Sequence, residues 1–550
     1  MTRTVLRGNT GGAQIAQGQS IPAPVGGWDA KNPLSAMPDV NAPILDNWIP
    51  RPGFVELRRG YTSQVAGFTA PVESLMAYRG LPSGDRLFAA SGGKIYDVST
   101  AGTLGAAVYS GATSNRWNYV NFPTAGVEWI IACTGSDTPA GFNGSSWTAM
   151  SFTGGPTAGV SSLFNVFSHK GRLYYMQQGT LSCWVPAAGA IQGALTQIDL
   201  TNVFSKGGRL IAGGNWSYQF GVTADDFAVF MTDQGQIAIY QGTDPTNAST
   251  WSLVGVYDFG PPLGPKALIK YGGDLAVLTV DGVIPLSQGL KLERAQQEAL
   301  ALTNNIMNAF GAAVRAYKGN FGWQGVLYPG ATASTNTTAS GGSLAIFNIP
   351  VQTLGTSMQF VQNVLTGAWC RLLNLDAFCW ELANGGIYFG TTNGVYQWDN
   401  GSSDAGTPIV GDVKSAFNNF GIPGREKRFT AIRPILNTTP LVAPALEVDV
   451  DYGESVPTAV PVVVQSGANT QTIRYDWTGA TGVGYVGAAR MQVNLAGDQA
   501  ASPLLAVDNA ANLLGVDAGL DTLFIQSALP FDVPCQLLGF DVLFQLGGSL

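Results

Sequence analysis

The side chains able to do chemistry are sparse in this sequence. A single histidine, His169, would have to serve as the base of any Ser-His-Asp or Cys-His arrangement. The sequence contains no Gly-x-Ser-x-Gly elbow, the usual seat of a serine nucleophile. Because a lone histidine is more often structural than catalytic, we expect no nucleophilic catalysis and predict that the chain is not an enzyme.

The cysteines do not have the spacing of a metal site. They number five and include no CxxC pair, so neither a zinc site nor a disulfide framework is indicated. The N-terminus lacks the apolar segment of a secretory signal, and no apolar run is long enough to predict a membrane-spanning helix. We therefore expect buried free thiols in a protein made in a reducing cytoplasm. The cysteines are Cys133, Cys183, Cys370, Cys379 and Cys535.

The carboxylates suggest two further kinds of chemistry, calcium binding and glycoside hydrolysis. Asp449, Asp451 and Glu454 could bind calcium, but the alternation Glu-Val-Asp-Val-Asp is typical of the solvent-facing side of a strand. A glycosidase needs two carboxylates brought together by the fold, and the 36 acidic residues include no pair that the sequence singles out. We therefore predict no catalytic, cofactor-binding or metal-ligating residue.

The charge balance bears on the partners of the protein. Charged residues make up 12% of the chain, and the net charge is −8. A protein that grips nucleic acid by its phosphates needs a basic stripe, and the densest basic runs are the short segments 58–59 and 425–428. We therefore expect no stable DNA binding, while an acidic wall past which DNA slides without sticking stays open. The sparse charge also favours a surface covered by other subunits, with a weakly charged monomer as the alternative.

The elements that would position these side chains are mostly short strands. Between about residues 54 and 400, an alternating apolar strand is followed by a glycine-containing turn and a second strand ending in an aromatic residue. The copies recur about every 42–55 residues, a spacing within reach of the four-stranded blades of a β-propeller. We predict an all-β protein with six blades, or possibly seven; a series of β-sandwiches is the competing interpretation. The clear copies are 86–97, 227–240, 274–286 and 386–399.

The chain divides into three parts around this repeat. Residues 1–53 are rich in Gly and Pro and predict an extended N-terminal arm, anchored by Trp28 and Trp48. Residues 54–404 form the predicted propeller, and residues 405–550 a C-terminal antiparallel β-sandwich.

One segment inside the predicted propeller has helical periodicity. Apolar residues recur at steps of three and four over residues 290–317, which predicts one amphipathic helix inserted in the propeller. It would cover the core of its own subunit or dock on a neighbouring one.

Several segments spread over most of the chain carry no catalytic motif but are informative together. The segments are Pro22–Trp28, Asp46–Pro50, Leu57–Tyr61, Val283–Ser287, Gly322–Gln324, Tyr388–Trp398, Lys427–Phe429 and Arg433–Pro434. Together they resemble the tail nozzle proteins (tail tubular protein B class) of short-tailed, podovirus-type bacteriophages.

The resemblance implies a structural virion protein, made in the host cytoplasm and located in the tail. Such proteins form a homohexameric ring that retains and then conducts DNA during ejection, so the implied partners are other copies of the chain, tail adaptor proteins above it and tail fibres or spikes. Contact with the host envelope and transient passage of DNA without specific binding are also implied. Two alternatives stay open: a glycan-binding or glycan-cleaving propeller of a tail-associated protein, and a head–tail adaptor.

Overall fold

The computed structural model divides the chain into two compact units, which we describe separately. One unit is Arg59–Ala405, and the other combines Met1–Arg58 with Gly406–Leu550. The structure describes residues 17–80, 84–220, 223–330, 342–422, 425–437, 445–450, 460–464, 470–476, 489–498, 524–526 and 535–549.

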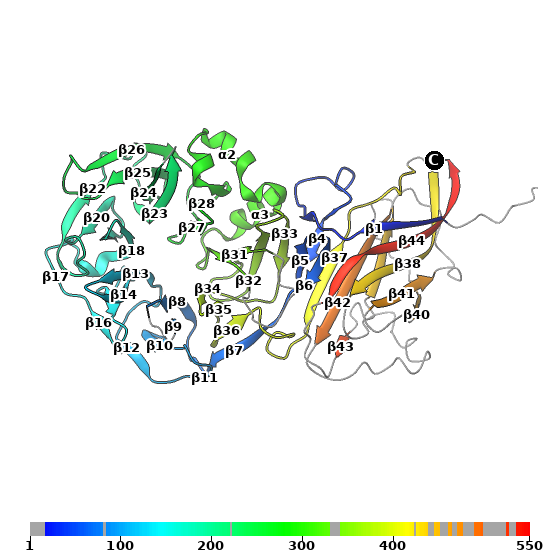
Figure 1. The fold of residues 1–550 in the computed structure, drawn as a ribbon, viewed down its shortest axis with the longest axis horizontal. Helices are drawn as coiled ribbons and strands as arrows, with labels where there is room; N and C mark the ends of the chain where they lie inside the picture. The colour runs from blue at the N-terminus through cyan, green and yellow to red at the C-terminus, as the bar shows by residue number, and fades with distance from the viewer. Residues whose placement is uncertain are drawn as a thin grey trace, which may run out of the picture. The chain divides into compact units, whose positions relative to one another are not determined.

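The Arg59–Ala405 unit is a β-propeller. Its described residues form seven successive sheets, which follow one another round a ring (Figure 1). The sequence repeat favours six blades, with seven as the alternative, and the structure has seven in its described residues. The first four sheets are β8 (Val72–Tyr78), β9 (Arg86–Ser91), β10 (Lys94–Asp97) and β12 (Ala107–Ser110); β13 (Asn118–Thr124), β14 (Val127–Cys133), β15 (Ala140–Phe142) and β16 (Trp147–Ala149); β18 (Leu163–His169), β19 (Arg172–Gln177), β20 (Ser182–Val185) and β22 (Thr196–Asp199); and β23 (Leu210–Phe220), β24 (Thr223–Thr232), β25 (Gln236–Gly242) and β26 (Trp251–Asp258).

The remaining three sheets close the ring. They are β27 (Leu268–Tyr271), β28 (Asp274–Thr279) and β29 (Gly282–Pro285); β30 (Gln324–Tyr328), β31 (Leu344–Pro350), β32 (Ser357–Asn363) and β33 (Trp369–Leu372); and β34 (Cys379–Ala383), β35 (Gly386–Gly390) and β36 (Gly394–Trp398) with β7 (Tyr61–Ala66). Strand β7 pairs antiparallel with β36, so the start of the unit completes its last sheet. The innermost strands contact one another in the order β8, β13, β18, β23, β27, β30, β34 and back to β8.

Short accessory elements connect these sheets. Strand β11 (Gly102–Thr103) runs parallel to β7, and β17 (Phe152–Thr153) runs parallel to β21 (Gly193–Ala194). A 3₁₀ turn, η1 (Val160–Ser162), precedes β18.

The repeat read from the sequence corresponds to hairpins within these sheets. Segment 86–97 forms β9 and β10 around Gly92 and Gly93, whose φ angles of 56° and 74° suit a two-residue hairpin turn. The aromatic residues of the repeat fill the space between neighbouring sheets: Phe88 on β9 packs against Phe142 on β15 with ring centroids 4.7 Å apart. Strands such as β9 are therefore buried on both faces, and the core is divided among the gaps between blades.

The helical insertion is present, but as several short pieces. They are α1 (Leu286–Gly289), α2 (Arg294–Leu300), the 3₁₀ helix η2 (Leu302–Ile306) and α3 (Met307–Tyr317). The single helix expected over 290–317 breaks at Ala301, where ψ is 135°. Fully buried Gln297 on α2 donates to the Asp258 and Gly289 carbonyls at 2.9 and 3.1 Å, so α2 is tied to β26 and α1 rather than continuing into α3.

The second unit takes strands from both ends of the chain. One sheet has the order β40-β41-β38-β44-β6-β5 with β1 also on β44, and β4, β37, β42 and β39 form another series with β43 on β42. The N-terminal strands are β1 (Gln17–Pro22), β2 (Gly27–Trp28), β3 (Asn41–Ala42), β4 (Ile44–Asp46), β5 (Trp48–Arg51) and β6 (Phe54–Leu57). The C-terminal strands are β37 (Ile409–Lys414), β38 (Arg425–Asn437), β39 (Ala445–Val450), β40 (Val460–Val464), β41 (Thr470–Asp476), β42 (Ala489–Asp498), β43 (Phe524–Gln526) and β44 (Gln536–Ser549).

The N-terminal segment differs from the extended arm that we expected over residues 1–53. From residue 17 onward it supplies strands to the second unit, because Gln17–Pro22 pairs with β44 and Ile44–Asp46 pairs with β37. Trp28 and Trp48 are buried there, 6% and 0% exposed, as their predicted anchoring role requires. The change from one unit to the other falls at residues 58/59 and 405/406, beside the boundaries of 54 and 404 drawn from the sequence.

Candidate functional site at the propeller axis

The innermost strands of the propeller enclose two adjoining cavities. One of about 330 Å³ is lined from β13, β18, β23, β27, β30 and β34, and one of about 220 Å³ is lined by residues that include Ser74 on β8 and Trp117. Asn118, Lys266 and Gln324 line both, so the cavities follow each other along the axis. Chemistry in the propeller would be expected here, where side chains from several blades converge.

Small residues let the blades approach closely around these cavities. A Cβ atom on Gly325 of β30 would lie 2.3 Å from Ile269 Cδ1 on β27, and one on Gly213 of β23 would lie 2.6 Å from the Phe167 ring on β18. Real Cβ contacts are not that short, so both positions require glycine. The two glycines therefore set the spacing of neighbouring blades at the axis.

Glu381 on β34 is the carboxylate of the axial cavity. Its carboxylate accepts a hydrogen bond from the Tyr119 hydroxyl on β13, and the same hydroxyl accepts from the Ala77 N–H of β8 at 3.1 Å. Arg79 Nη2 lies 3.4 Å from Glu381 Oε1, and half of the Arg79 side chain is exposed. One acid thus connects residues from three blades.

The electrostatics of this cluster follow from its burial. Loss of hydration raises the pKa of Glu381, against the opposing effects of the Tyr119 hydrogen bond and the charges of Arg79 and Lys266. Burial also raises the pKa of Tyr119 well above its ordinary value, with a smaller contribution from the charge of Glu381. The carboxyl of Glu381 therefore keeps its proton to a higher pH than an ordinary glutamate, and proton transfer is a chemical capacity that the axis offers.

The amide side chains at the axis hold the blades together. Asn118 Nδ2 on β13 donates to the Phe164 carbonyl on β18 at 3.0 Å, and Gln324 Nε2 on β30 donates to the Trp380 carbonyl on β34 at 2.8 Å. Asn121 Nδ2 on β13 likewise donates to the Ala77 carbonyl on β8 at 2.9 Å. Each bond joins the inner strands of neighbouring sheets, so these amides are engaged in structure.

The rim of the smaller cavity carries a cation held by an acid and an aromatic ring. Arg116 Nε lies 2.8 Å from Glu73 Oε2, and its guanidinium carbon lies 4.0 Å from the centre of the Phe321 ring. Such a cation–π contact contributes about 0.5–1 kcal/mol at an exposed site. Lys266 lies deeper, on the loop before β27.

His169 occupies a structural position. It is 1% exposed, with Nδ1 2.6 Å from Asn215 Oδ1 and Nε2 3.0 Å from the Gly242 carbonyl oxygen. Both ring nitrogens are therefore engaged with β23 and the end of β25, and neither faces a nucleophile.

The other residues considered in the sequence are also placed away from a common site. All five cysteines are free and buried. Asp449 lies on β39, whereas Asp451 and Glu454 lie outside the described residues. Among the residues that the structure describes, no group of three or more His, Cys, Asp or Glu side chains could hold a metal ion, and no helix is long and apolar enough to cross a membrane. The prediction that the chain is not an enzyme stays a prediction.

Sequence reasoning missed Glu381, Tyr119 and Lys266. One local signal was available for the acid, since Glu381 interrupts the otherwise apolar strand Cys-Trp-Glu-Leu-Ala. Nothing local identifies Tyr119 or Lys266, because only closure of the ring brings them near Glu381.

Comparison with solved structures gives distant likenesses, of which we report three. No family model matches the chain, and no curated protein does. A structure described as BBS1N in complex with ARL6DN, soaked with mercury, matches with a TM-score of 0.37 and 10% identity over 62% of this chain and 97% of that one. The lead-soaked form matches with a TM-score of 0.26 and 9% identity, over 39% of this chain and 64% of that one.

A second likeness is to a bacterial extracellular domain. The domain belongs to the putative hybrid two-component system BT4673 of B. thetaiotaomicron, with a TM-score of 0.36 and 10% identity over 68% of this chain and 42% of that one. Likenesses at this level carry no argument about function.

Proposed function

We propose that the chain is a structural subunit of a short bacteriophage tail, the distal nozzle, and that six copies form a ring that retains and then conducts DNA. The observation that carries this proposal is the small size of the axial cavities, about 330 and 220 Å³. The major groove of DNA alone is about 12 Å wide, so a duplex does not fit inside one propeller. A DNA conduit formed by this chain would therefore lie between several copies of it.

The charge of the protein supports the same proposal. Its net charge of −8 would make the wall of such a ring repel phosphates, and DNA would pass without sticking. Its low content of charged residues, 12%, suits a chain that covers much of its surface with neighbouring subunits. From the resemblance of its segments to tail nozzle proteins we infer the arrangement of the partners, with adaptor proteins above the ring and fibres or spikes around it.

The experiment is to image the purified full chain and tails that contain it. We expect ring-shaped particles of six subunits in electron micrographs, and an epitope-tagged copy at the distal end of the tail. A tagged subunit located next to the portal would support the head–tail adaptor instead. A protein that stays monomeric at high concentration and is absent from purified virions would overturn the proposal.

A second measurement tests the DNA-conducting role directly. In a gel-shift assay at low salt, where electrostatic attraction is strongest, we expect no retention of duplex DNA by the full chain. Tight, salt-sensitive DNA binding would contradict a lumen that lets DNA slide.

A further inference from the structure

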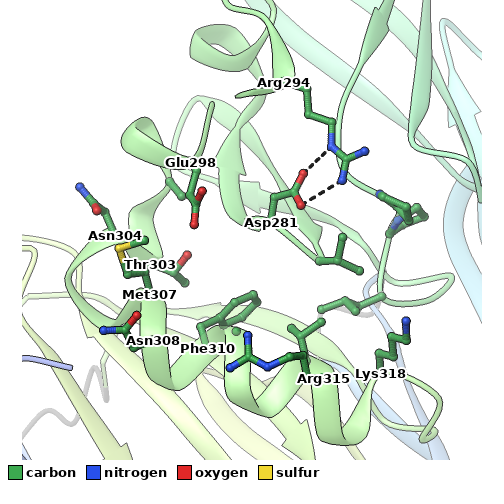
Figure 2. Close-up of a pocket in the computed structure, with 17 residues that line it drawn as sticks. Asp281, Arg294, Glu298, Thr303, Asn304, Met307, Asn308, Phe310, Arg315 and Lys318 are labelled. Atoms are coloured by element: carbon green, nitrogen blue, oxygen red, sulfur yellow. Dashed lines mark hydrogen bonds and ion pairs between the residues drawn. The ribbon is translucent and has the colours of Figure 1, made fainter. Parts of the chain in front are cut away.

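A cavity of about 570 Å³ lies beside the helical insertion (Figure 2). Its floor is one face of α3, and its other walls are α2, the loop at Pro261 and Pro262, and the β28–β29 turn at Asp281. All of these residues belong to the propeller unit. The volume is in the range of small-molecule sites, which is about 300–1,000 Å³.

Two positive charges reach this cavity without a partner. Arg315 in the last turn of α3 and Lys318 just after it both line the cavity, and Figure 2 shows them on the same side of it as Phe310. Neither makes an ion pair or side-chain hydrogen bond within the part of the chain that the structure describes. Both side chains are exposed, so an anionic ligand that enters the cavity can reach the two charges.

The third cation of the cavity is already neutralised. Arg294 Nε and Nη2 lie 2.6 and 3.0 Å from the two carboxylate oxygens of Asp281, a paired geometry that holds both side chains in place (Figure 2). Glu298 on α2 also lines the cavity and has no ion pair among the described residues. The cavity thus has a cationic side on α3 and an unpaired acid on α2.

The floor of the cavity is shaped by a glycine. Gly311 lies in the middle of α3, where glycine costs roughly 1 kcal/mol relative to alanine. A Cβ atom at this position would lie 3.3 Å from Arg315 Nη1, so the guanidinium lies over the space that the missing side chain leaves. Asn308, one turn earlier, lines the same floor, and its amide makes no hydrogen bond within the described residues.

We propose that this cavity binds a polyhydroxylated carboxylate, with the size and chemistry of one or two uronic acid residues. The guanidinium of Arg315 and the ammonium of Lys318 pair with the carboxylate. The Asn308 amide and Glu298 hydrogen-bond to hydroxyl groups, and the side chains of Pro262 and Met307 contact the C–H face of the ring.

The same residues disfavour two related classes of ligand, neutral sugars and phosphate-rich molecules. A neutral sugar gains no ion pair from Arg315 and Lys318, whereas a ligand with several phosphate groups is also repelled by the unpaired Glu298. Basic residues in the last turn also favour a helix through its dipole, so the test has to separate ligand binding from stability of α3.

The test is calorimetric titration of the full-length protein with glucuronate, galacturonate and their disaccharides. Glucose and inorganic phosphate are the comparison ligands. We expect the uronates to bind at least tenfold more tightly than either. Equal affinity for glucose, equal affinity for phosphate or no uronate binding would each overturn the proposal.

Two variants of the cavity make the test specific. Arg315→Gln with Lys318→Gln removes the cations, and Gly311→Leu fills the floor without changing charge; each should weaken uronate binding at least tenfold. The control, Arg209→Gln with Lys291→Gln, removes the same charge from exposed positions elsewhere in the propeller unit and should bind like the parent.

Thermal melting of each variant shows whether the fold is kept. Uronate binding that survives in both cavity variants would refute the site. The site belongs to one chain, so its outcome does not depend on whether six copies form a ring.

Discussion

Glu381 is largely buried in the propeller, where its ionised carboxylate is poorly hydrated, and this makes the stability of the fold depend on pH. Burial raises the pKa of Glu381 above its ordinary 4.5. The folded state therefore keeps the proton at a pH where the unfolded state has lost it, and the unfolding free energy falls as pH rises from about 4.5 through the folded-state pKa. We expect Glu381→Gln, which cannot titrate, to lose less stability than the parent between pH 5 and pH 8.

Urea unfolding at the two pH values measures this difference. Glu293→Gln, at an exposed position before α2, is the matched control and should show the pH dependence of the parent. A parent and a Glu381→Gln variant with identical slopes would mean that the carboxylate is solvated in the folded protein.

The turn glycines and the buried tryptophans could be identified from the sequence, but the axial cluster could not. Gly92 and Gly93 act through their own backbone angles, and Trp48 through its own apolar surface. Glu381 and Tyr119 instead depend on contacts between strands more than 200 residues apart in the sequence. A single sequence carries no signal for such a pairing.

At the scale of elements, hairpins were easier to predict than the helical insertion and the number of sheets. A hairpin such as β35–β36 is set by alternation and one turn, all within thirteen residues. The break in the helical segment depends instead on contacts with residues outside α2. Buried Gln297 donates hydrogen bonds to the Asp258 and Gly289 carbonyls. The blade formed by β27–β29 has only three strands in the described residues, although its hairpin at 274–286 is one of the clear copies of the repeat in the sequence.

The β28–β29 turn offers a test of how closely the insertion is packed. Gly282 has a φ of 132°, and a Cβ atom there would lie 2.6 Å from Thr303 Oγ1 and 2.9 Å from Ala301 Cβ. Both strain and overlap oppose a side chain, so we expect Gly282→Ala to lower the unfolding free energy by about 2–4 kcal/mol. Gly273→Ala, in the preceding turn of the same sheet with no atom within 4 Å, should change it by less than about 0.5 kcal/mol.

Denaturant unfolding of the two variants, followed by tryptophan fluorescence, checks this expectation. Equal stability of Gly282→Ala and Gly273→Ala would show that η2 moves freely away from the turn, and that the insertion is only loosely held on its sheet.

At the scale of the whole molecule, the chain closes two structures with strands from distant parts of its sequence. Strand β7 completes the propeller by pairing with β36, and β1 completes the second unit by pairing with β44. Neither unit can form until residues hundreds of positions apart meet, so folding of both is dominated by non-local contacts. Each unit has its own core, and we expect each to unfold as a separate cooperative step.

The five thiols report on these two steps, because they are divided between the units. Cys535 lies in the second unit, and Cys133, Cys183, Cys370 and Cys379 lie in the propeller; all are at most 2% exposed. Burial raises the pKa of Cys379 to about 12, and only the thiolate reacts with a disulfide reagent. We expect no labelling of the native protein by a chromogenic disulfide reagent, then one thiol labelled in one denaturant transition and four in another. In Cys535→Ser the one-thiol transition should vanish and the four-thiol transition stay in place, whereas release of all five thiols in a single step would mean that the two units unfold together.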